Sequence, residues 1–150
     1  DQGIRHRLVI VGDGPDRDFL PRMARALDIQ DTVIFTGYQA NPYPYMARSR
    51  FLASSSLTEG LPVIAMEALS LGIPIVSTVP SVGEAFGEEC CGLITENSVT
   101  ALEEGIRKML TDDVFFGKLK AGAERRSAYF DGKRMIREIE EMFVSLVEAN

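Results

Sequence analysis

Two carboxylates eight positions apart, Glu59 and Glu67, are the side chains of this chain best placed to do chemistry. Between them a Gly-Leu-Pro loop gives way to an apolar run, which predicts a helix with Pro62 as its first residue. A proline suits that position because its ring fixes φ and its missing N–H is not needed there. Glu67 then lies about 7.5 Å along the helix axis at 1.5 Å per residue. The pair therefore predicts a site with an acidic group on each side of a helix start.

The start of this helix offers open hydrogen-bond donors. Leu61 precedes Pro62 and has no side-chain oxygen that could cap the first turn. Uncapped backbone N–H groups and the helix dipole favour an external anion, such as a diphosphate. The helix is apolar almost all round, so we expect it to be largely buried and Glu67 to need a partner or a wet cleft. Taken alone, each glutamate is more commonly a solvated residue, and only the combined pattern is specific.

A second candidate loop, Gly-Asp-Gly-Pro, follows the first expected strand. Gly12 and Gly14 would let the backbone approach a ligand closely. A dinucleotide-binding fingerprint would need a third glycine where Arg17 stands, and the Gly-x-x-x-x-Gly-Lys phosphate loop is absent from the sequence. The same loop is also a common turn between a strand and a helix, so ligand contact and plain turn stay equal alternatives.

Short apolar runs alternate with amphipathic stretches along the chain, which predicts a parallel sheet with helices on both faces. The expected strands are Leu8 to Val11, Thr32 to Thr36, Phe51 to Ser54, Pro74 to Ser77 and Gly92 to Thr95. The other expected helices are Asp16 to Leu27, which Pro21 would either start late or kink, a turn at Met46 to Arg48, a helix to Leu110 with Thr100 and Glu103 as its capping box, Asp113 to Tyr129, and Lys133 to Ala149. Ligands of such sheets bind at the carboxyl ends of the strands.

The composition narrows the class of protein. A chain of 150 residues with 45% hydrophobic and 25% charged residues is typical of one globular domain. The net charge of −6 argues against a general affinity for nucleic acid or anionic lipid. A single histidine, His6, and two adjacent cysteines, Cys90 and Cys91, form no pattern for a metal site, a triad or a disulfide framework. We expect a reduced, cytoplasmic compartment, and no apolar run approaches the roughly 20 residues of a membrane span.

The segment EGLPVIAMEALSLGIPIV, Glu59 to Val76, resembles the nucleotide-binding half of retaining glycosyltransferases of the two-domain GT-B type, the glycosyl transferases group 1 or family 4 type. Members usually carry EGLPxxxxEALxxGxPVV. The resemblance covers about residues 7 to 112 and continues in LVIVGDGP at Leu8 to Pro15, VIFTGY at Val33 to Tyr38, YPYM at Tyr43 to Met46 and CGLIT at Cys91 to Thr95. It implies a Rossmann-like, doubly wound parallel sheet, the C-terminal half of a GT-B fold.

The resemblance also implies roles for the matching residues. Glu59 would be the catalytic-site carboxylate that contacts hydroxyls of the donor sugar, without acting as a nucleophile, and Glu67 would bind the ribose. The backbone around Gly60, Leu61 and Val63 would hold the diphosphate. The remaining donor-site residues would be Gly12, Gly14 and Tyr38, with the base near Gly37 and Tyr38.

The reaction that the resemblance implies is transfer of a sugar from a nucleotide diphosphate sugar to an acceptor hydroxyl, with retention, in polysaccharide or glycoconjugate biosynthesis. It would need neither a metal nor another cofactor, because the leaving diphosphate helps to take the acceptor proton. The two-carboxylate mechanism of glycoside hydrolysis fits badly, because one acid would sit at the ribose end of the donor.

The chain departs from the family pattern in three places. Ser49 and Arg50 stand where Ala-Asp is usual, and Val82 and Gly83 replace a Gly-Gly pair. The usual first strand, with the Gly-Arg loop and Lys-Gly that hold the diphosphate, has no counterpart. In the strand order 3-2-1-4-5-6 that strand is central, between the strands expected at residues 8–11 and 51–54. We therefore expect one donor-binding fragment over residues 1–150, with its core at 7–112 and C-terminal helices at 113–149, that is inactive alone.

Two alternatives to a transferase stay open. One is a related GT-B sugar epimerase or phosphorylase, although neither extra acid/base residues nor a pyridoxal phosphate lysine can be recognised. The other is a non-catalytic interaction domain that docks a partner through its two C-terminal helices. For the transferase, the expected partners are the nucleotide-sugar donor and a missing N-terminal acceptor domain, through which alone a peripheral membrane association would arise. An apolar sheet edge at the missing strand would also invite a homodimer.

Overall fold

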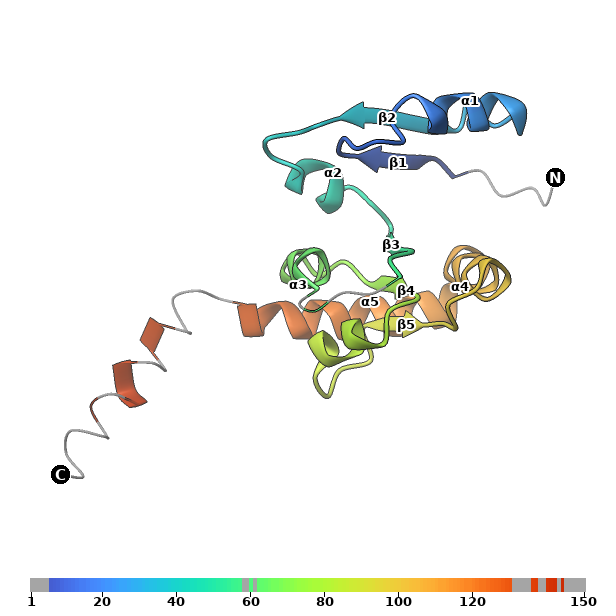
Figure 1. Cartoon of the computed structure of the whole chain (residues 1–150). Helices are drawn as coiled ribbons and strands as arrows, with labels where there is room; N and C mark the ends of the chain where they lie inside the picture. Colours follow the sequence, from blue (N-terminus) through green and yellow to red (C-terminus); the bar gives the residue numbers. More distant parts are fainter. Residues whose placement is uncertain are drawn as a thin grey trace. The chain divides into compact units, whose positions relative to one another are not determined.

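The computed structural model describes residues 6–57, 60, 62–130, 136, 137, 140–142 and 144 of the chain. Its contacts divide the chain into two compact units, Asp1–Arg48 and Ser49–Asn150. Figure 1 shows the elements of both units in chain order.

The first unit is a pair of parallel strands connected by a helix. Its elements are β1 (Leu8–Val11), α1 (Phe19–Ala26), β2 (Val33–Gly37) and α2 (Tyr43–Ala47). Leu8 pairs with Val33 and Ile10 with Phe35, and a shift in register then pairs Val11 with Gly37.

Prolines set the starts of both helices of this unit. α1 begins three residues after the expected Asp16, and Pro21 is its third residue, where a missing N–H is tolerated. The delayed start predicted from Pro21 is confirmed. α2 begins at Tyr43, earlier than the turn expected from Met46, with Pro44 in its first turn.

The second unit is a three-stranded parallel sheet with helices packed against it. Its elements are β3 (Leu52–Ser54), α3 (Val63–Ser70), β4 (Ile75–Ser77), the 3₁₀ helix η1 (Pro80–Phe86), β5 (Gly92–Ile94), α4 (Val99–Thr111), α5 (Asp113–Ser127) and the 3₁₀ turn η2 (Ala128–Phe130). The strand order is β3-β4-β5, and Ser54 pairs with Ser77, which pairs with Ile94. The carboxyl ends of the three strands therefore lie in line.

All five expected strands are present and parallel, so the expected α/β class is confirmed. Within the described residues β1 pairs with β2 alone and β3 pairs with β4 alone. The edge strands are therefore β1 and β2 in the first unit, and β3 and β5 in the second. The expected order 3-2-1-4-5-6 puts its central strand between β1 and β3.

The core of the second unit forms where α4 and α5 pack on the sheet. Val76 of β4, Met109 of α4 and Leu119 of α5 are fully buried together. The partly buried side chains packed around them are Phe51, Leu93, Leu102, Ile106, Phe115 and Phe116. Figure 1 shows α5 crossing the unit from α4 to α3, and it contacts both helices.

Two glycines allow this close packing. A Cβ on Gly122 of α5 would collide with the backbone carbonyl of Cys90. A Cβ on Gly105 of α4 would lie 2.8 Å from the Thr95 methyl group and 3.1 Å from a Val76 methyl group. Both helices thus approach the chain around β5 more closely than any larger residue would permit.

Three expectations about helices need correction. The N-cap of α4 is Ser98, whose Oγ accepts a hydrogen bond of 3.1 Å from the Ala101 N–H, and not Thr100. Pro62 is the N-cap of α3, with φ −79° and ψ 69°, so the helix begins one residue later than expected. α3 is buried along Ala65, Ala68 and Leu69, whereas Val63 is 51% and Ile64 41% exposed. A largely apolar helix therefore buries one face only, because the spacing of three and four residues puts Ala65, Ala68 and Leu69 on the packed side.

The last expected helix, Lys133 to Ala149, lies largely outside the described residues. The positions described there, 136, 137, 140–142 and 144, are helical. Ile136, Met142 and Val144 are exposed.

Candidate functional site

The second unit brings a helix start to the carboxyl end of β3, where a parallel sheet binds ligands. β3 ends at Ser54, and the chain reaches α3 within eight residues, ending in the buried Pro62. β4 ends beside it at Ser77 and leads into η1, which contacts α3. The connections that follow β3 and β4 therefore both start at this edge of the sheet.

The start of α3 has no side-chain cap among the described residues, as expected. Its first intrahelical bonds run from the N–H groups of Ala65 and Met66 to the Pro62 carbonyl, at 3.0 and 3.1 Å. The N–H groups of Val63 and Ile64 precede those bonds. Such groups at a helix start suit an anion.

Glu67 lies on α3 one turn beyond Val63. Residues four apart lie on the same face of a helix. The partly exposed Glu67 and the exposed Val63 therefore share one face of α3. The backbone carbonyl of Glu67 accepts a 2.7 Å bond from the Ser70 hydroxyl. This position puts a carboxylate about one helical turn from the N–H groups of Val63 and Ile64.

The other predicted residues of this segment are only partly described. Gly60 is exposed, between β3 and α3. Glu59 and Leu61 lie outside the described residues, so their predicted contacts stay predictions.

In the first unit the three remaining candidates lie at the carboxyl ends of β1 and β2. Gly12 follows β1 and its N–H donates to the Gly37 carbonyl at 2.9 Å, which joins the two strand ends. Gly12 has φ 129°, a conformation that requires glycine. Gly14 is exposed, and its N–H donates to Asp13 at 3.0 Å. Tyr38 follows β2 and is 76% exposed.

The sequence did not predict a group of hydroxyl residues that lies at the carboxyl edge of the second sheet. It consists of Ser54, Ser56, Ser77, Thr78 and Thr95. The Thr78 hydroxyl donates to the Ser56 carbonyl at 3.0 Å, and the Ser77 hydroxyl accepts from the Val79 N–H at 3.1 Å. The hydroxyls of Ser54 and Ser56 lie 3.5 Å apart, as do the Thr95 hydroxyl and the Ser77 carbonyl. The signal in the sequence is that each of these strands ends in, or is followed at once by, serine or threonine.

The η1 segment is held against the end of α5. The Arg126 Nε donates to the Ala85 carbonyl at 2.9 Å, and Arg125 pairs with Glu89 at 2.7 Å. The hydrogen bond from Arg125 lowers the pKa of the Glu89 carboxyl below its usual value. Val82 and Phe86 are buried, whereas Glu84 is exposed. Contacts with the end of α5 therefore hold the η1 segment and the residues just after it.

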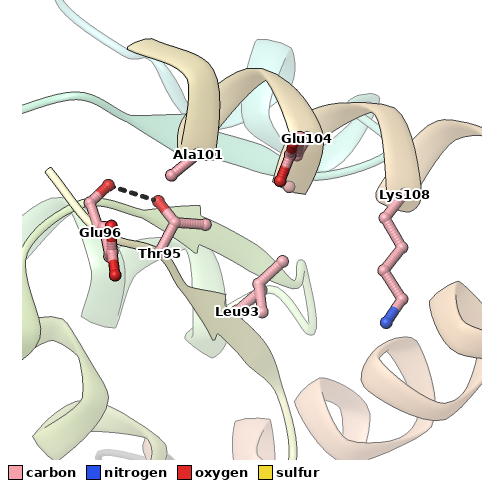
Figure 2. A pocket seen from close by; sticks show the side chains of 7 residues that line it. Leu93, Thr95, Glu96, Ala101, Glu104 and Lys108 are labelled. Carbon is pink, nitrogen blue, oxygen red and sulfur yellow. Dashed lines mark hydrogen bonds between the residues drawn. The ribbon is translucent and has the colours of Figure 1, made fainter. Parts of the chain in front are cut away.

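An open groove of about 260 Å³ lies between β5 and α4, and Figure 2 shows the side chains that line it. Glu104 and Lys108 line it from α4, and Thr95 and Glu96 line it from the end of β5. The dashed line joins the Thr95 hydroxyl to the Glu96 carbonyl, at 3.2 Å. β4 separates β5 from β3 in the sheet, and no predicted donor-site residue lines this groove. The groove is thus separate from the site at α3.

Across the part of the chain that the structure describes, no three His, Cys, Asp or Glu side chains group closely enough to hold a metal ion. No helix within that part is long and apolar enough to cross a membrane.

Comparison with known proteins decides the family. Residues 1–127 match the model of the family described as "Glycosyl transferases group 1". The chain belongs to the glycosyl transferases group 1 family. The matched range includes every candidate site residue in both units.

A relative of this group 1 glycosyltransferase chain is the N-acetylgalactosamine-N,N'-diacetylbacillosaminyl-diphospho-undecaprenol 4-alpha-N-acetylgalactosaminyltransferase of Campylobacter jejuni. It is 32% identical over 135 residues, which cover 88% of this chain and 37% of the relative.

Two solved structures share the fold of this group 1 chain. Sucrose-phosphate synthase from Thermosynechococcus elongatus has a TM-score of 0.73 at 21% identity, over 96% of this chain and 39% of that one. Anabaena Alr3699/HepE in complex with UDP has a TM-score of 0.75 at 21% identity, over 93% and 41%. The fold is therefore that of the C-terminal, Rossmann-like half of a GT-B glycosyltransferase. The chain spans about two fifths of the length of each of these three proteins.

Proposed function

We propose that this chain is the donor-binding part of a glycosyltransferase that moves a sugar from a nucleotide diphosphate sugar to an acceptor hydroxyl, with retention at the anomeric carbon. The observation that carries the proposal is the uncapped start of α3 with Glu67 one turn beyond it, at the carboxyl edge of the sheet. Family membership supports it, as does the UDP bound to one protein of the same fold.

Each part of the donor meets a group of matching chemistry in this proposal. The backbone N–H groups at Gly60, Leu61 and Val63 hold the diphosphate and stabilise the charge that develops on it as it leaves. The Glu67 carboxylate accepts hydrogen bonds from the ribose hydroxyls. Glu59 does the same for the hydroxyls of the donor sugar.

The remaining proposed donor contacts are in the loops that follow the two strands of the first unit. The backbone at Gly12 and Gly14 approaches the donor, and the nucleotide base packs near Tyr38. No metal takes part, because the leaving diphosphate itself accepts the acceptor proton.

The acceptor is bound by a further part of the enzyme. The Campylobacter relative is named for an acceptor linked to undecaprenol diphosphate, which supports a role in polysaccharide or glycoconjugate biosynthesis. The whole enzyme's reaction is part of this proposal, because the chain spans about two fifths of its relatives.

Titration with UDP, followed by the amide NMR signals of the protein, tests the site. The Glu67→Gln variant keeps the shape of the side chain and loses the charge, so the Kd for UDP should rise about tenfold, the equivalent of about 1.4 kcal/mol. Glu103→Gln is the matched control, because Glu103 is an exposed helical glutamate of α4 that pairs with Arg107 at 3.5 Å. UDP should shift the amide signals of Val63 and Ile64 first. An unchanged Kd in Glu67→Gln, or no response at α3, would overturn the assignment.

A further inference from the structure

We propose that the outer edge of β5 is a docking site for an extended, basic peptide segment of a partner protein, which adds a strand to the sheet beside α4. β5 is the last strand in the order β3-β4-β5, and within the described residues it pairs with β4 alone. A free strand edge presents backbone N–H and C=O groups with which a second chain can pair. None of the predicted donor-site residues belongs to this edge.

The ladder between β4 and β5 shows which backbone groups of β5 face outward. The Cys91 carbonyl and the Thr95 N–H both bond to β4, at 3.3 and 2.9 Å. In a parallel ladder every second residue bonds to a given neighbour. The N–H and C=O groups of Gly92 and Ile94 therefore point away from β4. Both residues are partly exposed, and in the described part of the chain these outward groups have no partner.

The groove between β5 and α4 runs along this free edge. It is lined by Leu93 and Thr95 on the β5 side and by the face of α4 between Ala101 and Lys108. No residue of β4 lines it, so it opens on the side of β5 that is turned away from β4. Figure 2 shows the side chains of α4 spread along the helix, across from Leu93 and Thr95. An added strand would thus lie between the β5 edge and the side chains of α4.

The charges of this groove favour a basic occupant. Glu96 and Glu104 are exposed, and neither forms an ion pair with another described residue. Lys108 already has an aromatic partner, because its Nζ lies 4.0 Å from the centroid of the Phe115 ring. Two carboxylates are therefore open to a cation from outside. The partly exposed Leu93 beside them suits the aliphatic stem of a lysine or arginine whose charged end reaches a carboxylate.

Backbone pairing and charge together define the occupant. Alternate side chains of an added strand point to the same face of the sheet, so basic residues two positions apart, about 6.6 Å, would both face α4. The side chains between them would face the opposite side. A second copy of this chain fits less well, because its own β5 edge would bring Glu96 and Glu104 against the same two carboxylates. The occupant is therefore an extended segment in which basic residues alternate with apolar ones.

The test uses the acetylated and amidated peptide Val-Lys-Val-Lys-Val, titrated into the isotope-labelled protein and followed by the amide NMR signals. The signals of Gly92 and Ile94 should shift, and their hydrogen exchange should slow, because these N–H groups gain acceptors. The signals of Leu93 and Thr95 should change less, because their N–H groups already bond to β4. Docking by charge alone would not give this alternation.

Matched variants and peptides separate the two parts of the interaction. Glu104→Gln should weaken the peptide about threefold, and its combination with Glu96→Gln about tenfold, as expected for exposed charge pairs. Glu103→Gln is the control, because Glu103 is the neighbouring glutamate of α4 and does not line the groove. It should leave the Kd within about 1.5-fold of the parent. The peptide with glutamate in place of lysine should bind at least about tenfold more weakly, and the peptide N-methylated at every residue should give no shift at Ile94.

Three results would overturn the proposal. The first is the absence of a saturable response at Gly92 and Ile94 up to about 5 mM peptide. The second is an equal response to the N-methylated peptide, because the contact would then not use the strand edge. The third is protection of both amides from exchange before peptide is added, because the edge would then already be occupied. Light scattering would show whether that occupant is a second copy or another part of the same chain.

Discussion

The guanidinium of Arg50 lies over the ring of Phe116, with its central carbon 3.8 Å from the ring centroid. Its Nε donates to the Met109 carbonyl at 3.2 Å, and a terminal nitrogen contacts Asp113 at 2.8 Å. Arg50 therefore ties the chain before β3 to the corner between α4 and α5. This explains how the chain uses an arginine where the family usually has an aspartate.

Removal of this contact should destabilise the second unit. Arg50→Met keeps the apolar stem but loses the stacking and the hydrogen bonds, so the free energy of unfolding should fall by about 1–2 kcal/mol. Arg50→Lys should keep only part of this stabilisation, because the lysine ammonium lacks the planar fork of donors that a guanidinium has. Urea denaturation measures the loss. Asp113→Asn is the control and should cost about 0.5 kcal/mol, since Asp113 is exposed. A loss for Arg50→Met no larger than that of the control would contradict this account.

Two glycines of α5 should respond in opposite directions to the same substitution. A Cβ at Gly117 meets no other atom within 4 Å, so Gly117→Ala should stabilise the helix by about 0.5–1 kcal/mol. Gly122→Ala should destabilise the protein by about 1–3 kcal/mol, because its Cβ would collide with the Cys90 carbonyl and force α5 away. Paired urea melts measure both changes. A gain in stability from Gly122→Ala would show that α5 does not pack this closely.

The capping residue of α4 can be identified by two alanine substitutions. Ser98→Ala removes the hydroxyl that accepts from Ala101 and should cost about 1 kcal/mol. Thr100→Ala should cost little, because Thr100 is exposed and lies inside the helix. Thermal unfolding of both variants decides between them. The reverse order of stability would restore the capping box first expected at Thr100.

Cys90 and Cys91 should differ in reactivity. Burial raises the pKa of the Cys91 thiol to about 11, whereas Cys90 is exposed. The folded-state pKa lies above the unfolded one, so the neutral thiol is favoured by folding. This contribution to stability is complete below about pH 9 and is lost as the pH rises toward about 11.

Alkylation with iodoacetamide measures this difference. At pH 8 one thiol should react in the native protein, and Cys90→Ser should resist labelling until urea unfolds it. Labelling of native Cys90→Ser should become appreciable only as the pH rises from about 9 toward 11. Rapid labelling of that variant at pH 8 would mean that Cys91 is not buried.

Local sequence was enough to predict the elements and the position of Glu67 beyond a helix start. The five strands were predictable because each is a short apolar run bounded by turn residues. Pro62 and the apolar run after it placed α3 within one residue. The Glu-x₇-Glu pattern also pointed to the family that the comparison then established.

The local sequence did not predict contacts between residues that are far apart in the chain. Thr78 and Ser56 are 22 positions apart, and Arg50 and Asp113 are 63 apart. Ser98 and Thr100 both carry a hydroxyl, and only the extended backbone of Ser98, with φ −143° and ψ 153°, makes it the cap. Glu59 and Leu61 keep the roles that the resemblance implies as predictions.

By itself, then, the sequence determined the order of strands and helices, the family, and the position of a glutamate beyond a helix start. These follow from the spacing of residues that are close in the chain. The tertiary structure decided which face of α3 is buried, how closely α5 approaches Cys90, and which hydroxyls join the strand ends. These depend on which surfaces meet once the strands pair, because close packing and hydrogen bonds act over a few ångströms whatever the separation in sequence.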